Sequence, residues 1–198
     1  MGRGTPRLPR PARLTDRKGD EMGDQFLTVM AVLDDDAQRI MTNWQSRILA
    51  AGLRGTQTMG IPFHISLGSY PPSREAELIA LIRKTAAAHG AFPVDLTALG
   101  DFNDRVLFAR PDDSAPLAAL RAVFNHDYPH RFPWSPHATL FCGQEDEVRQ
   151  ARSILSPLFA PFRARVTALE MGRFFPAHFV CRQALTGNEG PHPEASFN

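Results

Sequence analysis

Two short segments of the sequence place a histidine and a hydroxyl-bearing residue two positions apart. His64-Ile65-Ser66-Leu67 and His137-Ala138-Thr139-Leu140 share the order histidine, apolar residue, hydroxyl residue, leucine. Because successive side chains of a strand point to opposite faces, each histidine and its hydroxyl lie on one face. Near neutral pH one imidazole accepts a proton while a protonated one donates, so the pair predicts general acid–base chemistry.

The repeated motif also has a structural explanation, because a single histidine at a sheet surface is usually a hydrogen-bonded structural residue. The chain holds seven histidines, so roughly 0.7 histidine-x-hydroxyl triplets are expected by chance. Both segments follow a helix and a loop and precede another helix, as duplication of one structural unit predicts. An unrelated α/β enzyme with two structural triplets remains the alternative, and it predicts that His64 and His137 lie far apart.

Hydrophobic periodicity predicts strands that alternate with amphipathic helices. Apolar residues at helical spacing from Ala37 to Ile48 predict a helix that stops near Gly52. A second helix follows two prolines, with Ser73 as its expected cap. Strands are expected at about residues 26–33, 63–68, 92–99, 105–110, 136–141, 162–170 and 179–185.

Composition sets the expected boundaries of the domain. Residues 1–23 are expected to form a disordered basic tail, because they contain three prolines and few large apolar residues. Residues 24–186 are expected to form one bilobal domain, and residues 187–198 a loose polar tail. With 22 basic and 21 acidic residues, the chain lacks the strongly basic balance of a protein that holds duplex DNA.

The sequence favours a setting without membranes or metals. No segment approaches the roughly 18 to 20 apolar residues that span a bilayer. Cys142 and Cys181 lie in apolar strand-like segments, which favours a reducing, cytoplasmic location. His126 and His130 have the spacing of metal ligands on a helix, but prolines interrupt that helix. We therefore expect no metal and no cofactor, and a monomer is favoured.

The paired motifs resemble the two-histidine (2H) phosphoesterase superfamily, which includes bacterial RNA 2',3'-cyclic phosphodiesterases, also called 2'-5' RNA ligases. The likeness covers about residues 24–186. It implies an α+β fold of two pseudo-symmetric lobes, with two antiparallel sheets lining a central cleft and helices outside. It also implies that His64 and His137 are the catalytic pair and that Ser66 and Thr139 bind the phosphate oxygens.

The resemblance implies a metal-independent hydrolase that opens a 2',3'-cyclic phosphate or cleaves a 2'-5' phosphodiester in RNA or a nucleotide. The alternative is a non-catalytic module that binds a nucleotide or an RNA end in the same cleft. One departure bears on RNA processing. Many RNA-directed members carry an arginine shortly after the second motif, where this chain has Phe141, Cys142 and Gly143.

Other side chains near the expected cleft are candidate substrate contacts. Aromatic residues that could stack on a nucleobase, or pack at the lobe edges instead, are Tyr70, Trp134 and Phe175. Cations that could neutralise a phosphate, or lie solvated at the surface instead, are Arg131, Arg173 and Arg182.

Overall fold

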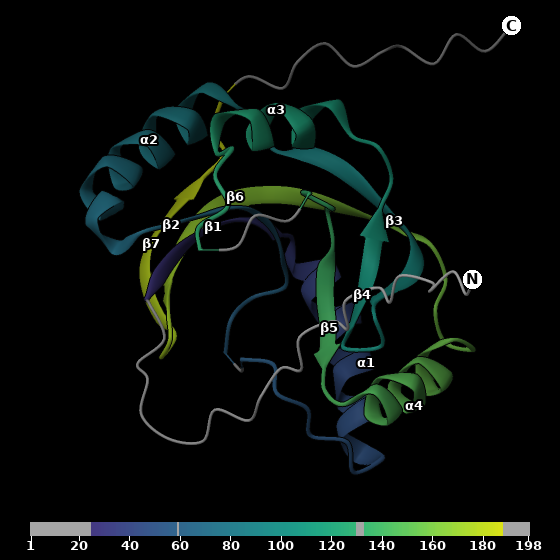
Figure 1. The fold of residues 1–198 in the computed structure, drawn as a ribbon. Helices are drawn as coiled ribbons and strands as arrows, with labels where there is room; N and C mark the ends of the chain where they lie inside the picture. The colour runs from purple at the N-terminus through teal and green to yellow at the C-terminus, as the bar shows by residue number, and fades with distance from the viewer. Residues whose placement is uncertain (1–24, 59, 130–132, 188–198) are drawn as a thin grey trace, which may run out of the picture.

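The structure is a computed structural model that describes residues 25–58, 60–129 and 133–187. The predicted tail of residues 1–23 lies outside the described residues, as does nearly all of the predicted C-terminal tail. The elements in chain order are β1 (Phe26–Leu33), α1 (Asp35–Ala50), β2 (His64–Tyr70), a 3₁₀ turn (Pro72–Arg74), α2 (Glu75–Ala88), β3 (Phe92–Phe102), β4 (Val106–Pro111), α3 (Ala115–Val123), β5 (Ala138–Cys142), α4 (Glu145–Leu155), β6 (Phe162–Phe174) and β7 (His178–Ala184) (Figure 1).

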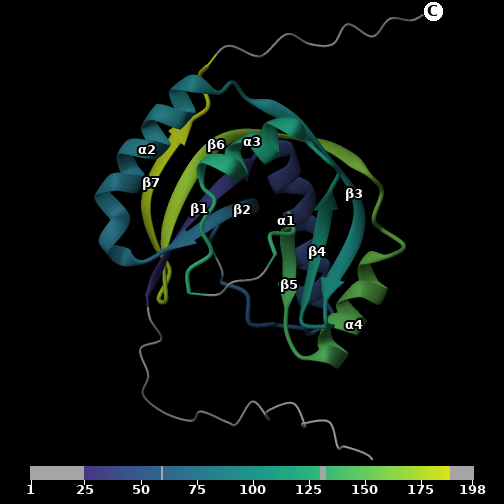
Figure 2. The same ribbon diagram turned by 45° about the horizontal axis from the view of Figure 1, so that its top comes forward.

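One antiparallel sheet of seven strands organises the fold. Its order is β2-β1-β6-β3-β4-β5, and β7 pairs with the part of β6 that extends beyond β3. The sheet is strongly curved (Figure 2), and the strands at the two ends of this order, β2 and β5, come into contact with each other. These are the strands that begin at, or just after, the two motif histidines, so the curvature brings the two motifs together.

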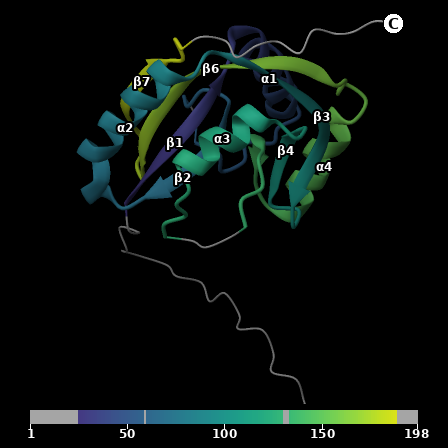
Figure 3. The same cartoon turned by 90° about the horizontal axis from the view of Figure 1, so that it is seen from above.

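The helices pack outside the curved sheet in two groups. Helices α1 and α4 contact each other, and they pack against strands β4, β5 and β6. Helix α2 packs on β6 and β7, and α3 packs on β2. Figure 3 shows α2 and α4 at opposite ends of the molecule, with α3 between them. No helix within the described residues is long and apolar enough to cross a membrane.

Helix α1 illustrates how the sequence determines an element. The Asp34 side chain caps it by accepting a hydrogen bond from the backbone N–H of Ala37 at 3.0 Å. Its buried stripe includes Met41 and Ile48, both with no exposed surface. Gly52, with a φ of 86°, follows the last turn in the left-handed conformation that favours glycine. The predicted apolar stripe and stop of this helix are confirmed.

The α+β architecture is confirmed, and the two expected sheets are joined into one because β6 pairs with both β1 and β3. One local prediction is wrong. Ser73 does not cap the second helix, since it lies inside the 3₁₀ turn and α2 begins two residues later, at Glu75. The prolines at 71 and 72 favour that tighter turn, because proline fixes the backbone at the start of a helical segment.

Candidate functional site

The first motif occupies edge strand β2. His64 begins the strand, and its Nδ1 lies 2.7 Å from the carbonyl oxygen of Pro62. In the neutral ring this contact favours a proton on Nδ1 and leaves Nε2 as an acceptor. Burial lowers the pKa of His64 below 6.5, the Pro62 carbonyl opposes this, and the charge of His137 lowers the pKa further. The two imidazoles therefore lie close enough for one to affect the protonation of the other.

The second motif occupies the opposite edge strand. His137 directly precedes β5, and its Nδ1 lies 2.8 Å from the carbonyl oxygen of Ser135, an arrangement that matches that of His64. The imidazole also contacts two aromatic rings, with centroid distances of 4.8 Å to Phe102 and 5.3 Å to Phe108. Burial lowers the pKa of His137 below 6.5, against the opposing effect of the Ser135 carbonyl.

Both motif strands carry a β-bulge at the leucine that follows the hydroxyl residue. The pairing of β1 with β2 skips Leu67, and the pairing of β4 with β5 skips Leu140. A bulge reverses the alternation of side chains beyond it. The third residue after each hydroxyl residue therefore faces the cleft, and these residues are Ser69 and Cys142. This shared irregularity extends the likeness of the two motifs from sequence to backbone geometry.

The motifs line two adjoining cavities, which we call the His64 half and the His137 half of the cleft. The His64 half has a volume of about 570 Å³, and its lining includes His64, Ser66, Thr139, Cys142, Phe174 and Phe175. The His137 half has a volume of about 660 Å³, and its lining includes His137, Ser66, Ser69, Phe102, Tyr128 and Trp134. Ser66 and Phe26 border both halves. All four motif residues thus lie along one cleft.

The cleft is poor in charge. Among the described residues that line it there is no lysine or arginine, and Asp127 is the one carboxylate. Asp127 is paired with Arg121, with 2.7 Å between carboxylate oxygen and guanidinium nitrogen. An anionic ligand would therefore meet imidazoles, hydroxyls and main-chain dipoles rather than a cluster of basic side chains.

Two of the predicted aromatic contacts lie at the cleft. Trp134 lines the His137 half, and its indole N–H donates to the carbonyl oxygen of Ser66 at 2.9 Å. Phe175 lines the rim of the His64 half, is 63% exposed and packs edge-on against Phe26. Both side chains are accessible to a ligand in the cleft.

The prediction that Tyr70 contacts the substrate is wrong. Tyr70 is 2% exposed, stacks on His126 and lies beneath the guanidinium of Arg74. Burial raises its pKa to about 12. The reason is the bulge at Leu67, because the alternation that would bring Tyr70 to the face of Ser66 is reversed there.

The predicted arginine contacts do not lie at the cleft where the structure describes them. Arg173 projects from the face of β6 opposite to Phe174 and pairs with Glu75 of α2. Arg182 lies 3.5 Å from the buried carboxylate of Glu170 and lines neither half. Both predictions are therefore wrong, since neighbouring carboxylates hold these guanidinium groups elsewhere. Arg131 lies outside the described residues.

Polar residues on α1 form a wall of the cleft that the sequence analysis missed. Gln38, Thr42 and Gln45 line the His64 half. The Gln38 amide also exchanges two hydrogen bonds, both of 2.8 Å, with the backbone of Phe63, and so fixes the chain just before His64. The signal was present in the sequence, because these uncharged polar residues recur at helical spacing beside the apolar stripe.

The described residues contain no group of three or more histidines, cysteines or carboxylates that could hold a metal ion. His126, considered above as a metal ligand, instead has its Nδ1 2.7 Å from the carbonyl oxygen of Ser69. Its candidate partner at position 130 lies outside the described residues. Cys142 and Cys181 are free thiols, and burial raises the pKa of each.

The 2H phosphoesterase class is defined by a curved antiparallel sheet in which two strands each bring a histidine and a hydroxyl residue to one cleft. The strands β2 and β5 do so here. The model of the 2'-5' RNA ligase superfamily matches residues 33–174. The chain belongs to this superfamily, which places it among enzymes that act on phosphodiester bonds. The alternative of an unrelated α/β enzyme is thereby excluded.

Solved structures show the same fold at low sequence identity. E. coli LigT in complex with NADP+ is 17% identical, with a TM-score of 0.57 over 82% of this chain and 98% of LigT. A protein described as a phosphoesterase is 17% identical, with a TM-score of 0.57 over 82% of this chain and 99% of its own. TT0787 of Thermus thermophilus is 16% identical, with a TM-score of 0.55 over 83% and 100% of the two chains. No curated protein matches the chain in sequence.

Proposed function

We propose that the protein is a metal-independent phosphodiesterase that opens a 2',3'-cyclic phosphate or cleaves a 2'-5' phosphodiester in RNA or a nucleotide. One observation carries the proposal. Two half-buried imidazoles, from opposite edge strands, each place Nδ1 on a main-chain carbonyl and each accompany a hydroxyl in one cleft. This arrangement leaves two Nε2 atoms for proton transfer on either side of a bound phosphate.

The chemistry requires His64 and His137 in opposite protonation states. The neutral imidazole takes a proton from water as the water oxygen bonds to phosphorus. The imidazolium gives its proton to the departing ribose oxygen as the phosphorus–oxygen bond breaks. The two histidines end with their protonation states exchanged, and solvent restores the starting states. Neither proton transfer requires a metal.

Hydroxyls and one imidazolium bind the phosphate, because the described lining of the cleft has no lysine or arginine. Ser66 and Thr139 donate hydrogen bonds to the non-bridging oxygens, where hydroxyls aimed at developing charge are most effective. A phosphodiester carries a single negative charge, which one imidazolium balances. LigT has been crystallised with 3'-AMP, ATP and NADP+, and this supports a nucleotide as the substrate of the present protein.

Hydrolysis of a defined panel of substrates tests the proposal. The panel comprises the four nucleoside 2',3'-cyclic phosphates and 2'-5'-linked and 3'-5'-linked dinucleotides, assayed in excess chelator. The variants are His64→Ala and His137→Ala, each expected to lower kcat by about 10²- to 10⁴-fold, because each removes one proton-transfer group. The matched control is His89→Ala, since His89 is half-buried and has the same contact of Nδ1 with a carbonyl, that of Thr85, but lies outside the cleft.

Each outcome separates the proposal from its alternative. Turnover that survives chelator, collapses in both cleft variants and persists in His89→Ala supports the proposal. Turnover lost on chelation contradicts the metal-independent part. Tight nucleotide binding without turnover in the unaltered protein supports a non-catalytic binding module instead.

A further inference from the structure

We propose that Phe102 is a positioning residue for His137, and that the anchored β3–β4 hairpin holds its ring against the imidazole and keeps water away from it. The inference deepens the proposed function and rests on it for its catalytic consequence. Its structural part is that the Phe102 ring fixes the position and the hydration of the His137 imidazole, and this part can be tested without any enzymatic activity.

His137 needs support that His64 does not need. His64 is the first residue of β2 and is paired across the ladder with Val32. His137 precedes β5 and lies outside the ladder, so strand pairing does not fix its backbone. A side chain on a loop is positioned less precisely than one on a strand, and a group that transfers protons must be positioned precisely.

Two aromatic rings on one face of the hairpin pack against the His137 imidazole. Phe102 meets His137 edge to face, with centroids 4.8 Å apart and an interplanar angle of 89°. Phe108, which is 5% exposed, lies 4.4 Å from Phe102 and 5.3 Å from His137. Gly100 makes this packing possible, because a Cβ there would lie 2.4 Å from the Phe108 ring. The hairpin thus has an aromatic surface shaped around the imidazole.

The turn that carries Phe102 has a defined conformation. Arg105 donates its backbone N–H to the carbonyl oxygen of Phe102 at 2.9 Å. The two central residues, Asn103 and Asp104, have φ values of 49° and 52°. Positive φ at both central positions is the requirement of a type I′ hairpin turn, whose twist matches that of the flanking strands. The position of Phe102 is therefore set by the hairpin rather than by a flexible loop.

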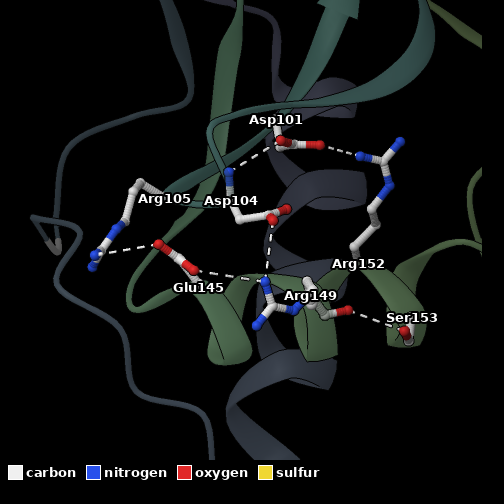
Figure 4. Close-up of polar contacts among 7 residues, drawn as sticks. All are labelled: Asp101, Asp104, Arg105, Glu145, Arg149, Arg152 and Ser153. Carbon is white, nitrogen blue, oxygen red and sulfur yellow. Dashed lines mark hydrogen bonds and ion pairs between the residues drawn. The ribbon is translucent and has the colours of Figure 1, made fainter. Parts of the chain in front are cut away.

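The opposite side of the hairpin is tied to α4 (Figure 4). Arg152 pairs with Asp101, and Arg149 lies 3.2 Å from the carboxylate of Asp104. Glu145 extends the network by lying 3.8 Å from Arg149 and 3.7 Å from Arg105. Helix and hairpin thereby form one unit, with ion pairs on one face and the rings against His137 on the other.

The experiment reads the protonation of His137 directly. NMR titration of the imidazole resonances, assigned with His64→Gln and His137→Gln, is recorded for Phe102→Leu and Phe102→Ala. Because burial lowers the pKa of His137, admitting water should move its titration to higher pH, more in Phe102→Ala than in Phe102→Leu. The matched control is Phe162→Leu, since Phe162 is also half-buried and packs edge-on against a ring, that of Trp44, away from both histidines.

Kinetics of the same variants test the catalytic consequence. For Phe102→Ala we expect a fall in kcat of at least about tenfold, with the limb of the pH–rate profile that reports His137 moved to higher pH. A His137 titration that is unchanged in folded Phe102→Ala and Phe102→Leu would overturn the inference and leave the proposed function intact. A loss confined to KM would also overturn it, because Phe102 would then act by contacting substrate. A shifted titration in a protein without turnover would sustain the positioning role and reject the proposed function.

Discussion

Arg121 is the charged residue on which the wall of the His137 half depends most. It lies at the end of α3 with 8% of its surface exposed. Its guanidinium donates to the carbonyl oxygens of Leu67 and Phe124, and pairs with Asp127 at 2.7 Å. Its guanidinium carbon also lies 5.5 Å from the ring centre of Trp134. One side chain thus joins the motif strand β2, the end of α3 and two residues of the cleft wall.

We predict that Arg121→Met destabilises the protein by about 3 kcal/mol. The substitution keeps an unbranched side chain but removes the donors to two carbonyls, and a hydrogen bond to a charged group contributes roughly 1.5 to 3 kcal/mol. The bond to Phe124, at 3.4 Å, contributes at the lower end. The Asp127 carboxylate is 35% exposed, so water compensates for part of the lost pair. For a domain of this size, the loss corresponds to a fall in Tm of roughly 6 to 12 °C.

Urea unfolding, followed by fluorescence and circular dichroism, measures this change. The control is Arg149→Met, because the ion pair of Arg149 with Asp104 joins side chains that are 56% and 41% exposed. Exposed pairs contribute roughly 1 kcal/mol or less, so the control should unfold close to the unaltered protein. If the free energy of unfolding of Arg121→Met also lies within about 1 kcal/mol of that of the unaltered protein, the reasoning that the buried donors of Arg121 hold this wall together is refuted.

Four further predictions follow from the site. Because burial lowers the pKa of both His64 and His137, kcat/KM should trace a bell whose two limbs lie below about pH 6.5, and a limb above that value would contradict this. The same lowered pKa values mean that the unfolded chain binds protons first as the pH falls. Stability should therefore decline from about pH 6.5 down to the folded-state pKa values, and urea midpoints of the doubly substituted His→Gln protein should decline less. Ser66→Ala and Thr139→Ala should each lower kcat by about 100-fold with the fold intact, whereas Thr139→Ser should retain most of the activity. Gly68→Ala should lower the urea midpoint by an amount equivalent to about 1 to 3 kcal/mol, since its Cβ would lie 2.1 Å from a main-chain oxygen of the α3–β5 connection; an unchanged midpoint would refute that packing.

Local sequence patterns were sufficient to predict the elements that carry the site. The alternation in each motif correctly indicated that His64 shares a strand face with Ser66, and the structure also brings Thr139 to the cleft. The helical stripe of α1 was equally readable, since its period depends only on nearby residues. The pairing of strands distant in sequence could not be predicted in this way. That both motifs lie at the edges of one curved sheet follows from β6 pairing with β1 and β3, which alternation does not specify.

The prediction for Tyr70 failed for a related reason. Strict alternation from His64 and Ser66 brings Tyr70 to the same face, but the extra residue at Leu67 reverses the order. Gly68, beside Leu67, is a residue type that often marks a bulge in a strand, but a glycine alone does not fix the register, because a leucine fits either one. The predictions for Arg173 and Arg182 failed because each arginine pairs with a carboxylate on another element, Glu75 for Arg173 and Glu170 for Arg182. Local sequence patterns do not specify such pairs.

The two halves of the site are alike in chemistry but differ in how they are held. Each has a histidine with Nδ1 on a main-chain carbonyl, a hydroxyl residue and a bulge at the next leucine. The strand ladder holds His64, whereas His137 lies before its strand and is held by the rings of Phe102 and Phe108. Since the charge of His137 lowers the pKa of His64, a change in the setting of His137 alters the protonation of both histidines. The hairpin and α4 therefore belong to the same functional unit as the cleft, although Arg149 and Arg152 line neither half of it.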